Sequence, residues 1–258
     1  VMIAVFFALS QEIASLKSRV NILKKIRYAH AAVYQSEFCG FPIMLVQGGV
    51  GQNMAETVRN LSNSFRIQVM VSSGFAGSIN PGVGVGDLII GRRIFHTPQE
   101  EFNGEIEIDS THTCDDALVT MASRLSSAGG FKAHCGDILC VNKVVSQAAA
   151  KKQLGIRTSA ICVDMESSII AARAHELGIP FVAIRAISDG MDEDMEVSES
   201  VITKGGNINI PVAAYHLLSK PHQIPDMNRL RSQIKRAKKT LSKFFPDFIT
   251  QTYNSLLA

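Results

Sequence analysis

The chain alternates short apolar runs with amphipathic stretches along most of its length. Runs of β-branched and other apolar residues predict strands over about 1–9, 27–37, 41–47, 67–72, 85–94, 131–145, 160–163 and 180–184. Apolar residues at helical spacing predict helices over about 10–22, 52–65, 115–127, 146–154 and 167–178. The runs joined through Cys39-Gly40 predict a hairpin, so we expect a single α/β domain with a mixed sheet.

Two segments that end β-prone runs carry acidic residues. They are Val163-Asp164-Met165-Glu166-Ser167 and Ile184-Arg185-Ala186-Ile187-Ser188-Asp189, and the short helix predicted over 167–178 lies between them. A strand, a helix and a strand in this order predict a right-handed unit with neighbouring parallel strands. Ligands of α/β sheets bind at the carboxyl ends of such strands, so this pattern predicts a site.

The acids of these segments allow two interpretations each. Asp164 and Glu166 flank Met165, and in a continuing strand both carboxylates would share one face and could accept hydrogen bonds from a vicinal diol such as ribose. The alternative is that Asp164 caps the following helix and Glu166 occupies its first turn. Asp189 could be a buried acid with a raised pKa that protonates a leaving nitrogen, or it could cap a loop or pair with Arg185.

Two glycine-rich segments each lie between a strand and the next element: Gly48-Gly49-Val50-Gly51 and Gly74-Phe75-Ala76-Gly77. Small residues there let backbone N–H groups approach a ligand. Neither segment is followed by the Gly-Lys-Ser or Gly-Lys-Thr of a Walker A loop, and the first lacks the third glycine of a dinucleotide-binding loop. Tight turns and anion sites therefore both remain possible interpretations.

Composition is that of an ordinary globular protein, with 46% hydrophobic and 19% charged residues among 258. We interpret the opening segment as a buried first strand and not as a signal peptide. Five cysteines without paired or metal-ligand spacing indicate reduced thiols in a cytoplasmic protein, and seven scattered histidines show no ligand spacing. We therefore expect no metal site, and no nucleic-acid partner.

The positive charge of the chain belongs to its tail. Seven of the 26 basic residues lie within 229–243, which holds no acid, so the remainder has 19 basic against 23 acidic residues. Apolar residues within 226–248 follow helical spacing between these basic residues. Such a helix could contact an anionic membrane, or it could pack on its own domain with a solvated basic face. We divide the chain into a domain over 1–219 and a basic helical extension of it over 220–258.

Taken together, these motifs resemble the nucleoside phosphorylase/nucleosidase superfamily, and within it the methylthioadenosine/S-adenosylhomocysteine nucleosidase type, over residues 2–219. The resemblance rests, in chain order, on Glu12 after the first strand, Gly48-Gly49-Val50-Gly51, Ser73-Gly74-Phe75-Ala76-Gly77 with Val85-Gly86-Asp87, Val163-Asp164-Met165-Glu166 and Arg185-Ala186-Ile187-Ser188-Asp189. It implies a mixed, partly closed sheet flanked by helices, a homodimer or higher homo-oligomer, a purine nucleoside substrate, and no metal or organic cofactor.

The resemblance also implies roles for individual residues. Asp189 would protonate the purine at N7 and Glu12 would position or deprotonate the attacking water. The remaining residues implied at the substrate are Met165 and Glu166 on the ribose, Ser188 and Arg185 on the Asp189 carboxyl, and Asp164, Gly74, Phe75, Ala76, Val144 and Val145. Three of these positions depart from the family pattern. Phe75 stands where a small hydroxyl residue is usual, Val144 and Val145 stand in the segment that usually supplies an aromatic, and Asp164 replaces a longer acid.

The nucleophile follows from the same comparison. Phosphorylases of this superfamily use an arginine just before the glycine-rich turn, where this chain has Ser72 and Ser73. The Glu12 carboxylate would also repel phosphate, so the sequence favours water, although Arg92 and Arg93 could reach a phosphate co-substrate.

Two alternatives to hydrolysis stay open. The Pro-punctuated segment 220–225 before a basic helix resembles the hopanoid-associated phosphorylase branch, which implies phosphorolysis of a lipid-linked adenosyl nucleoside. A non-catalytic nucleoside-binding protein is the other.

Overall fold

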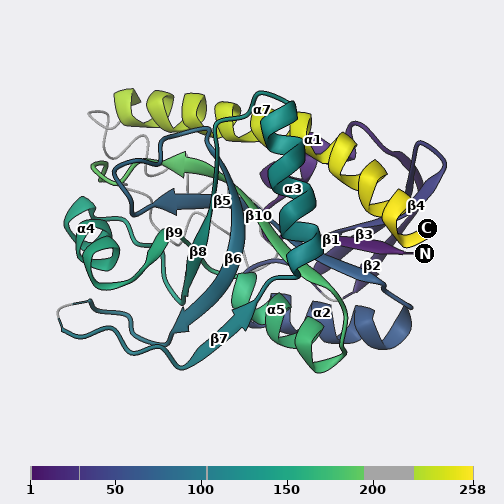
Figure 1. Cartoon of the computed structure of the whole chain (residues 1–258), viewed down its shortest axis with the longest axis horizontal. Helices are drawn as coiled ribbons and strands as arrows, with labels where there is room; N and C mark the ends of the chain where they lie inside the picture. Colours follow the sequence, from purple (N-terminus) through teal and green to yellow (C-terminus); the bar gives the residue numbers. More distant parts are fainter. Residues whose placement is uncertain (1, 29, 103, 195–223, 258) are drawn as a thin grey trace.

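The computed structural model describes residues 2–28, 30–102, 104–194 and 224–257, and Figure 1 shows their arrangement. Its strands form one sheet: β1 (Ile3–Phe7), β2 (Asn21–Tyr28), β3 (Ala31–Phe38), β4 (Phe41–Gln47), β5 (Val69–Ser78), β6 (Leu88–Thr97), β7 (Ser110–Thr113), β8 (Ala133–Val141), β9 (Ala160–Asp164) and β10 (Phe181–Asp189). The helices are α1 (Ser10–Lys17), α2 (Gln52–Ser64), α3 (Asp116–Ala128), α4 (Ala148–Arg157), α5 (Ser167–Glu176) and α7 (Ile224–Leu257).

Half of the sheet closes on itself. The strand order is β10-β6-β8-β9-β5-β1-β4-β3-β2, and β10 also pairs with β5, so β5, β9, β8, β6 and β10 form a ring. From β5 the sheet continues outward through β1 to the antiparallel hairpin of β3 and β4, with β2 at the edge. Parallel pairs such as β1 with β5 and antiparallel pairs such as β10 with β6 make the sheet mixed. The predicted α/β fold with a mixed, partly closed sheet is confirmed.

Helices cover both faces of this sheet. In Figure 1, α2 and α5 lie together on one side, and α1, α3 and α7 lie together on the other. The central strand β1 is therefore covered on both faces, and its five residues IAVFF are all buried. A strand with two covered faces reads as a continuous apolar run and not as an alternation, which explains the apolar opening of the sequence.

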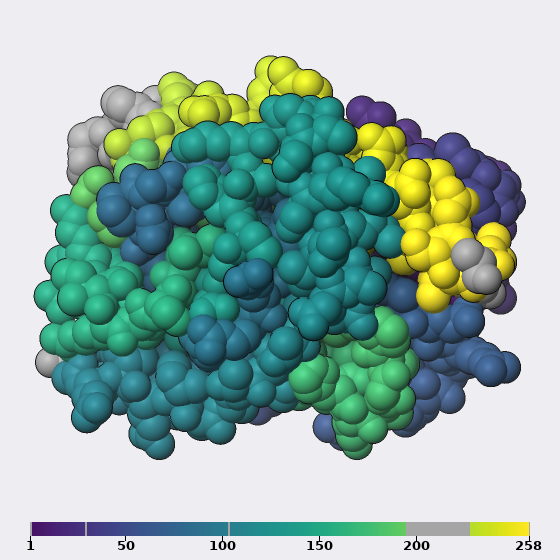
Figure 2. All heavy atoms as spheres, viewed as in Figure 1, coloured from purple at the N-terminus to yellow at the C-terminus, as the bar shows by residue number. Residues whose placement is uncertain are grey.

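The basic tail forms α7, which packs on its own domain. Its apolar side chains contact α1, α3 and β10 and are at most 1% exposed: Ala237, Leu241, Phe244, Phe245, Phe248, Ile249 and Tyr253. Figure 2 shows the helix lying flush against its neighbours. The packed interpretation of the apolar stripe is confirmed, so any contact with an anionic surface would have to use the basic face alone. Among the described residues, no helix is long and apolar enough to span a bilayer. The predicted boundary at 219/220 lies outside the described ranges.

The predicted βαβ unit is wrong in its pairing. β9 and β10 are joined by α5 as expected, but they are not neighbours, because β5 lies between them. β10 runs parallel to β5, whereas β9 runs antiparallel to it. Their carboxyl ends nevertheless meet, since both pair with the last residues of β5. The two acidic segments converge through a third strand and not through direct pairing.

Two local predictions also differ from the structure. Residues 74–77 do not form a turn, because β5 continues through them to Ser78. The helix predicted over 10–22 ends at Lys17, and Asn21–Tyr28 is the edge strand β2. Val20 and Ile22 happen to continue the helical spacing of α1, which is why the periodicity of the sequence did not separate the two elements. By contrast, residues 48–51 form the predicted turn, with Gly49 and Gly51 at positive φ.

Candidate active site

The end of β5 is where the predicted site residues come together. Gly77 pairs with Val163 of β9 on one side and with Asp189 of β10 on the other. A Cβ at Gly77 would lie 2.9 Å from Asp189 Oδ2 and 3.4 Å from the Val163 side chain. Glycine is therefore needed here, because any larger residue would push the Asp189 carboxylate out of place.

Asp189 is 3% exposed and is held at both oxygens. Oδ1 accepts a hydrogen bond of 2.7 Å from Ser188 Oγ, as the resemblance implies for Ser188. Oδ2 accepts one of 2.5 Å from the ammonium of Lys151, a residue of α4 that is fully buried. The sequence analysis did not single out Lys151, since nothing in the sequence separates it from the adjacent Lys152 in the same predicted helix. The Asp189 side chain is thus fixed in one orientation.

Glu12 is the second buried acid, and it projects from α1 onto the same strand. Its Oε2 accepts hydrogen bonds from the N–H groups of Ala8 (3.0 Å) and Leu9 (2.8 Å), and Oε1 accepts one from Phe75 N–H (2.8 Å). Burial raises the pKa of Glu12, while these N–H groups and Arg185 act in the opposite direction. A buried carboxylate whose pKa lies nearer to neutral is a better general base than an exposed one.

Gly74 makes room for Glu12. A Cβ on Gly74 would collide with Glu12 Oε1, and the φ angle of +152° is one that side chains rarely adopt. Gly74 and Gly77 are three residues apart on β5, which corresponds to about 10 Å of strand. Each glycine accommodates one acid, so Glu12 and Asp189 approach the backbone of β5 at two positions along the strand.

Arg185 and Asp164 form a buried ion pair, with 2.7 Å between Nε and Oδ2. Arg185 Nη2 also donates to Ser72 Oγ (2.6 Å) and Ser167 Oγ (2.9 Å), and Asp164 accepts from the Ser167 hydroxyl and N–H. The expectation that Arg185 holds the Asp189 carboxyl is wrong, because its hydrogen bonds go to the Asp164 side. Asp164 is engaged at the start of α5, so the helix-terminus interpretation describes it better than direct contact with a sugar.

Glu166 and Met165 remain half-buried beside this ion pair. Burial raises the pKa of Glu166 well above its ordinary value, and the nearby Asp164 and Glu12 carboxylates add to this, while Arg185 opposes it. Three acids therefore surround one guanidinium. Such a cluster favours a neighbouring group that gains positive charge.

Replacing Glu166 by glutamine should stabilise the protein at neutral pH. Because the pKa of Glu166 is raised in the folded state, the folded state binds more protons than the unfolded state above about pH 4.3, and stability falls as pH rises through that window. We expect Glu166→Gln to gain about 1 kcal/mol at pH 7.5, or roughly 2–4 °C in Tm. Urea and thermal unfolding at pH 7.5 and pH 5 measure this. A difference in stability between Glu166→Gln and the unaltered protein that does not narrow at pH 5 would contradict this prediction.

An apolar wall completes the site. Val145 is buried with Leu139, Val141 and Val163, and Met165 packs against this cluster. Val144 and Phe75 are half-buried. Phe102 and Ile106 pack on the same cluster from the segment between β6 and β7, and Arg157 donates hydrogen bonds to the carbonyls of Phe102 and Gly104. This polar segment therefore packs against the apolar wall through its two isolated apolar residues.

Groups that could hold an anion are largely engaged. Arg93 pairs with Asp137, with 3.1 Å from Nε to Oδ1, whereas Arg92 is exposed. Ser72 accepts a hydrogen bond from Arg185, and the buried Ser73 hydroxyl has no partner among the described residues. No cluster of potential metal ligands occurs within the described ranges. A single unpaired hydroxyl matches water more simply than phosphate.

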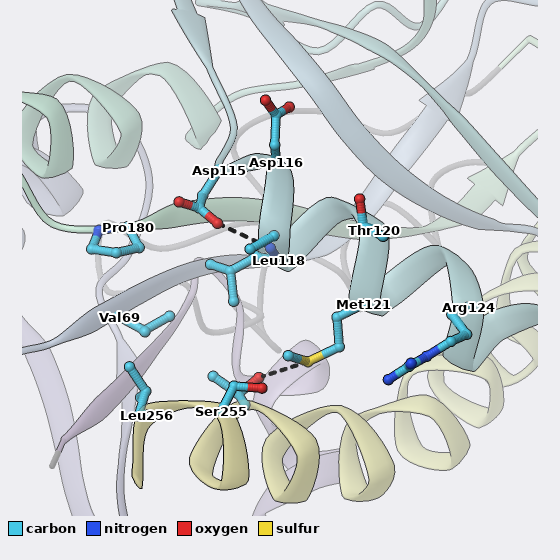
Figure 3. A pocket seen from close by; sticks show the side chains of 12 residues that line it. Val69, Asp115, Asp116, Leu118, Thr120, Met121, Arg124, Pro180, Ser255 and Leu256 are labelled. Atoms are coloured by element: carbon cyan, nitrogen blue, oxygen red, sulfur yellow. Dashed lines mark hydrogen bonds between the residues drawn. The ribbon is translucent and has the colours of Figure 1, made fainter. Parts of the chain in front are cut away.

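A pocket of about 690 Å³ lies elsewhere, between α3 and α7. Figure 3 shows Met121 and Arg124 of α3 facing Ser255 and Leu256 of α7, with Asp115 and Asp116 at the start of α3. Val69 begins β5 and Pro180 precedes β10, so this pocket lies at the amino ends of these two strands. Gly74, which adjoins Glu12, and Asp189 lie farther along the strands, toward their carboxyl ends. It contains none of the predicted site residues, and we do not assign it to the reaction.

Comparison with known proteins shows the family of the chain. The family model described as the Phosphorylase superfamily matches residues 2–213. A 5'-methylthioadenosine/S-adenosylhomocysteine nucleosidase of Halalkalibacterium halodurans is 27% identical over 215 residues, 80% of this chain and 93% of the relative. The nucleosidase of that name from Buchnera aphidicola is 28% identical over 220 residues, covering 82% and 91%.

Two solved structures share the fold. A nucleosidase of the same name from Neisseria meningitidis, in complex with methylthio-immucillin-A, superposes with a TM-score of 0.74 at 21% identity, covering 97% of this chain and 99% of the other. The futalosine hydrolase of Helicobacter pylori gives a TM-score of 0.75 at 17% identity, with 97% of each chain covered.

Proposed function

The chain belongs to the phosphorylase superfamily, and we propose that it cleaves the N-glycosidic bond of an adenine-type purine nucleoside with water as the nucleophile. The observation that carries this proposal is that two buried acids approach the backbone of β5. Glu12 of α1 does so at Gly74, and Asp189 of β10 does so at Gly77. The sequence relatives are named for nucleosides that carry adenine, which supports the choice of base.

The chemistry requires one acid at each end of the substrate. Breaking the bond between C1′ of the ribose and N9 of the purine leaves positive charge on the sugar and negative charge on the base. Asp189 would pass a proton to N7 while N9 takes the bonding electron pair. Glu12 would accept a proton from the water whose oxygen bonds to C1′. Met165 and Glu166 would hold the ribose between them, and Ser188 would orient the Asp189 carboxyl.

Water and phosphate are distinguished by one assay. We expect adenine release from methylthioadenosine in phosphate-free buffer, with free 5-methylthioribose as the second product, because the buried Glu12 carboxylate would repel a phosphate beside it. Adding phosphate should change the rate less than about twofold, since no step would use it. Product analysis by mass spectrometry checks this. Release that requires phosphate and yields a sugar 1-phosphate would instead establish the phosphorylase alternative.

The 5′ substituent is tested with the same assay. Adenosine, S-adenosylhomocysteine and 5′-alkyl adenosines of increasing length, compared by kcat/KM, distinguish a small thioether substrate from the lipid-linked alternative. We also propose a homodimer, as the resemblance implies, and its mass in solution by light scattering checks this.

A further inference from the structure

Lys151 lies in α4, beside β9 at the edge of the molecule in Figure 1, yet its side chain is fully buried. Its ammonium donates to Asp189 Oδ2 at 2.5 Å and to the carbonyl oxygens of Gly190 and Glu193, each at 3.0 Å. These three hydrogen bonds use all three protons of the ammonium. The charge is therefore directed at one carboxylate and at the backbone that follows it.

A buried ammonium is costly, and an apolar side chain would fill the same volume without that cost. The rest of α4 shows that the position of the 190–194 segment does not depend on Lys151 alone. Ala148 N–H donates to Asp194 Oδ1 at 2.7 Å, and Lys152 pairs with Asp192 at the surface at 2.7 Å. Lys151 is therefore not needed only to fix this segment, and its ammonium faces Asp189, the acid assigned to the departing base.

We propose that Lys151 is a positioning residue for the cleavage reaction: its ammonium holds Asp189 in one orientation and stabilises the carboxylate left when the proton passes to the base. This inference rests on the proposed function. As the C1′–N9 bond breaks and its electrons move to the purine, the Asp189 carboxyl proton moves to N7, and the new negative charge on Asp189 lies directly against Lys151. The interaction is stronger after the proton transfer than before it, which is the condition for accelerating that step.

Three groups near Asp189 that carry charge or titrate lie within the described residues. Lys151 faces it from α4, Glu193 belongs to the segment that follows it, and the Cys162 thiol lies on β9. The Glu193 carboxylate accepts hydrogen bonds from Gly190 N–H and from the Gln233 amide of α7. Burial raises the pKa of Cys162 so that the thiol stays neutral. Removing the Lys151 charge therefore removes the one cation that these neighbours place against Asp189.

The test compares Lys151→Met with Lys152→Met, which removes the adjacent surface lysine and its pair with Asp192. For methylthioadenosine we expect Lys151→Met to lower kcat about 10- to 100-fold with KM changed less than about threefold, because the charge acts on the proton-transfer step. Lys152→Met should match the unaltered enzyme in both respects within about twofold.

Lys151→Gln, which is uncharged but keeps hydrogen-bond donors, is measured alongside in case the methionine variant unfolds, and thermal unfolding is recorded for every variant. A rise of KM as large as the loss of kcat would assign Lys151 a purely structural role and overturn the proposal. Kinetics like those of Lys152→Met would overturn it as well. If the unaltered enzyme releases no base from any adenine nucleoside, the proposed function itself is wrong.

Discussion

Asp189→Asn should lose about 100- to 10,000-fold in kcat for adenine release, the range that a positioned general acid contributes. Asparagine has the size of aspartate, its one oxygen can still accept from Lys151, and its NH2 can donate to Ser188 Oγ, but it has no carboxyl proton to give to N7. Binding of the nucleoside should change much less than kcat, because we propose that Met165 and Glu166 hold the ribose. Steady-state kinetics and equilibrium binding of a nucleoside analogue measure the two effects separately.

Stability needs a control in this experiment. Asp189→Asn leaves the Lys151 ammonium buried without a counter-charge, and breaking a buried pair in this way costs about 3–5 kcal/mol. The double variant Asp189→Asn with Lys151→Met removes both charges and should recover part of that loss while remaining inactive. Asp192→Asn alters an exposed acid of the same segment, paired with Lys152, and should keep normal kcat. Activity of Asp189→Asn within about threefold of the unaltered enzyme would refute the role of Asp189.

Glu12→Gln should have the second large effect, again about 100- to 10,000-fold in kcat with little change in nucleoside binding. Glu12 accepts three backbone N–H groups through its two oxygens, whereas glutamine offers one oxygen and an NH2 that would face an N–H donor. The variant therefore loses both the base and part of its orientation. Kinetics across pH 4 to 9 provide the measurement.

The dependence of kcat on pH tests whether Glu12 acts as a base. Burial raises the pKa of Glu12, and the base works only when ionised, so kcat of the unaltered enzyme should fall on the acid side at a pH above the ordinary glutamate value of about 4.3. This fall of kcat on the acid side should be absent in Glu12→Gln. Gly74→Ala is the companion variant, because its Cβ would displace the Glu12 carboxylate without removing it. If Gly74→Ala and Glu12→Gln both kept normal kcat, Glu12 would have no part in activating the nucleophile.

Much of this site could be predicted from short motifs. Asp189, Glu166 and Glu12 were identified because acids that follow apolar strands are visible in the sequence and match a known family. Their convergence was predicted for the wrong reason, since β9 and β10 meet across β5 and do not pair with each other. Local pattern shows where a strand ends but not which strand lies next to it.

The partners of these acids could not be predicted in the same way. The Lys151–Asp189 contact joins residues 38 apart, and the Arg185–Asp164 pair depends on which face of β10 is turned toward α5. Such contacts follow from tertiary packing, for which a single sequence carries no signal. The glycines at 74 and 77 illustrate the same limit. They look like a turn in the sequence, but in the fold they keep β5 extended where two carboxylates approach its backbone.

The most direct measurement is a crystal structure of the enzyme with a non-cleavable adenine nucleoside analogue. We predict that N7 of the base lies within hydrogen-bond distance of Asp189, that the ribose lies between Met165 and Glu166, and that a water on the far side of C1′ is bound to Glu12. A ligand with its base at Glu12, or one bound in the pocket between α3 and α7, would contradict the assignment of the two acids.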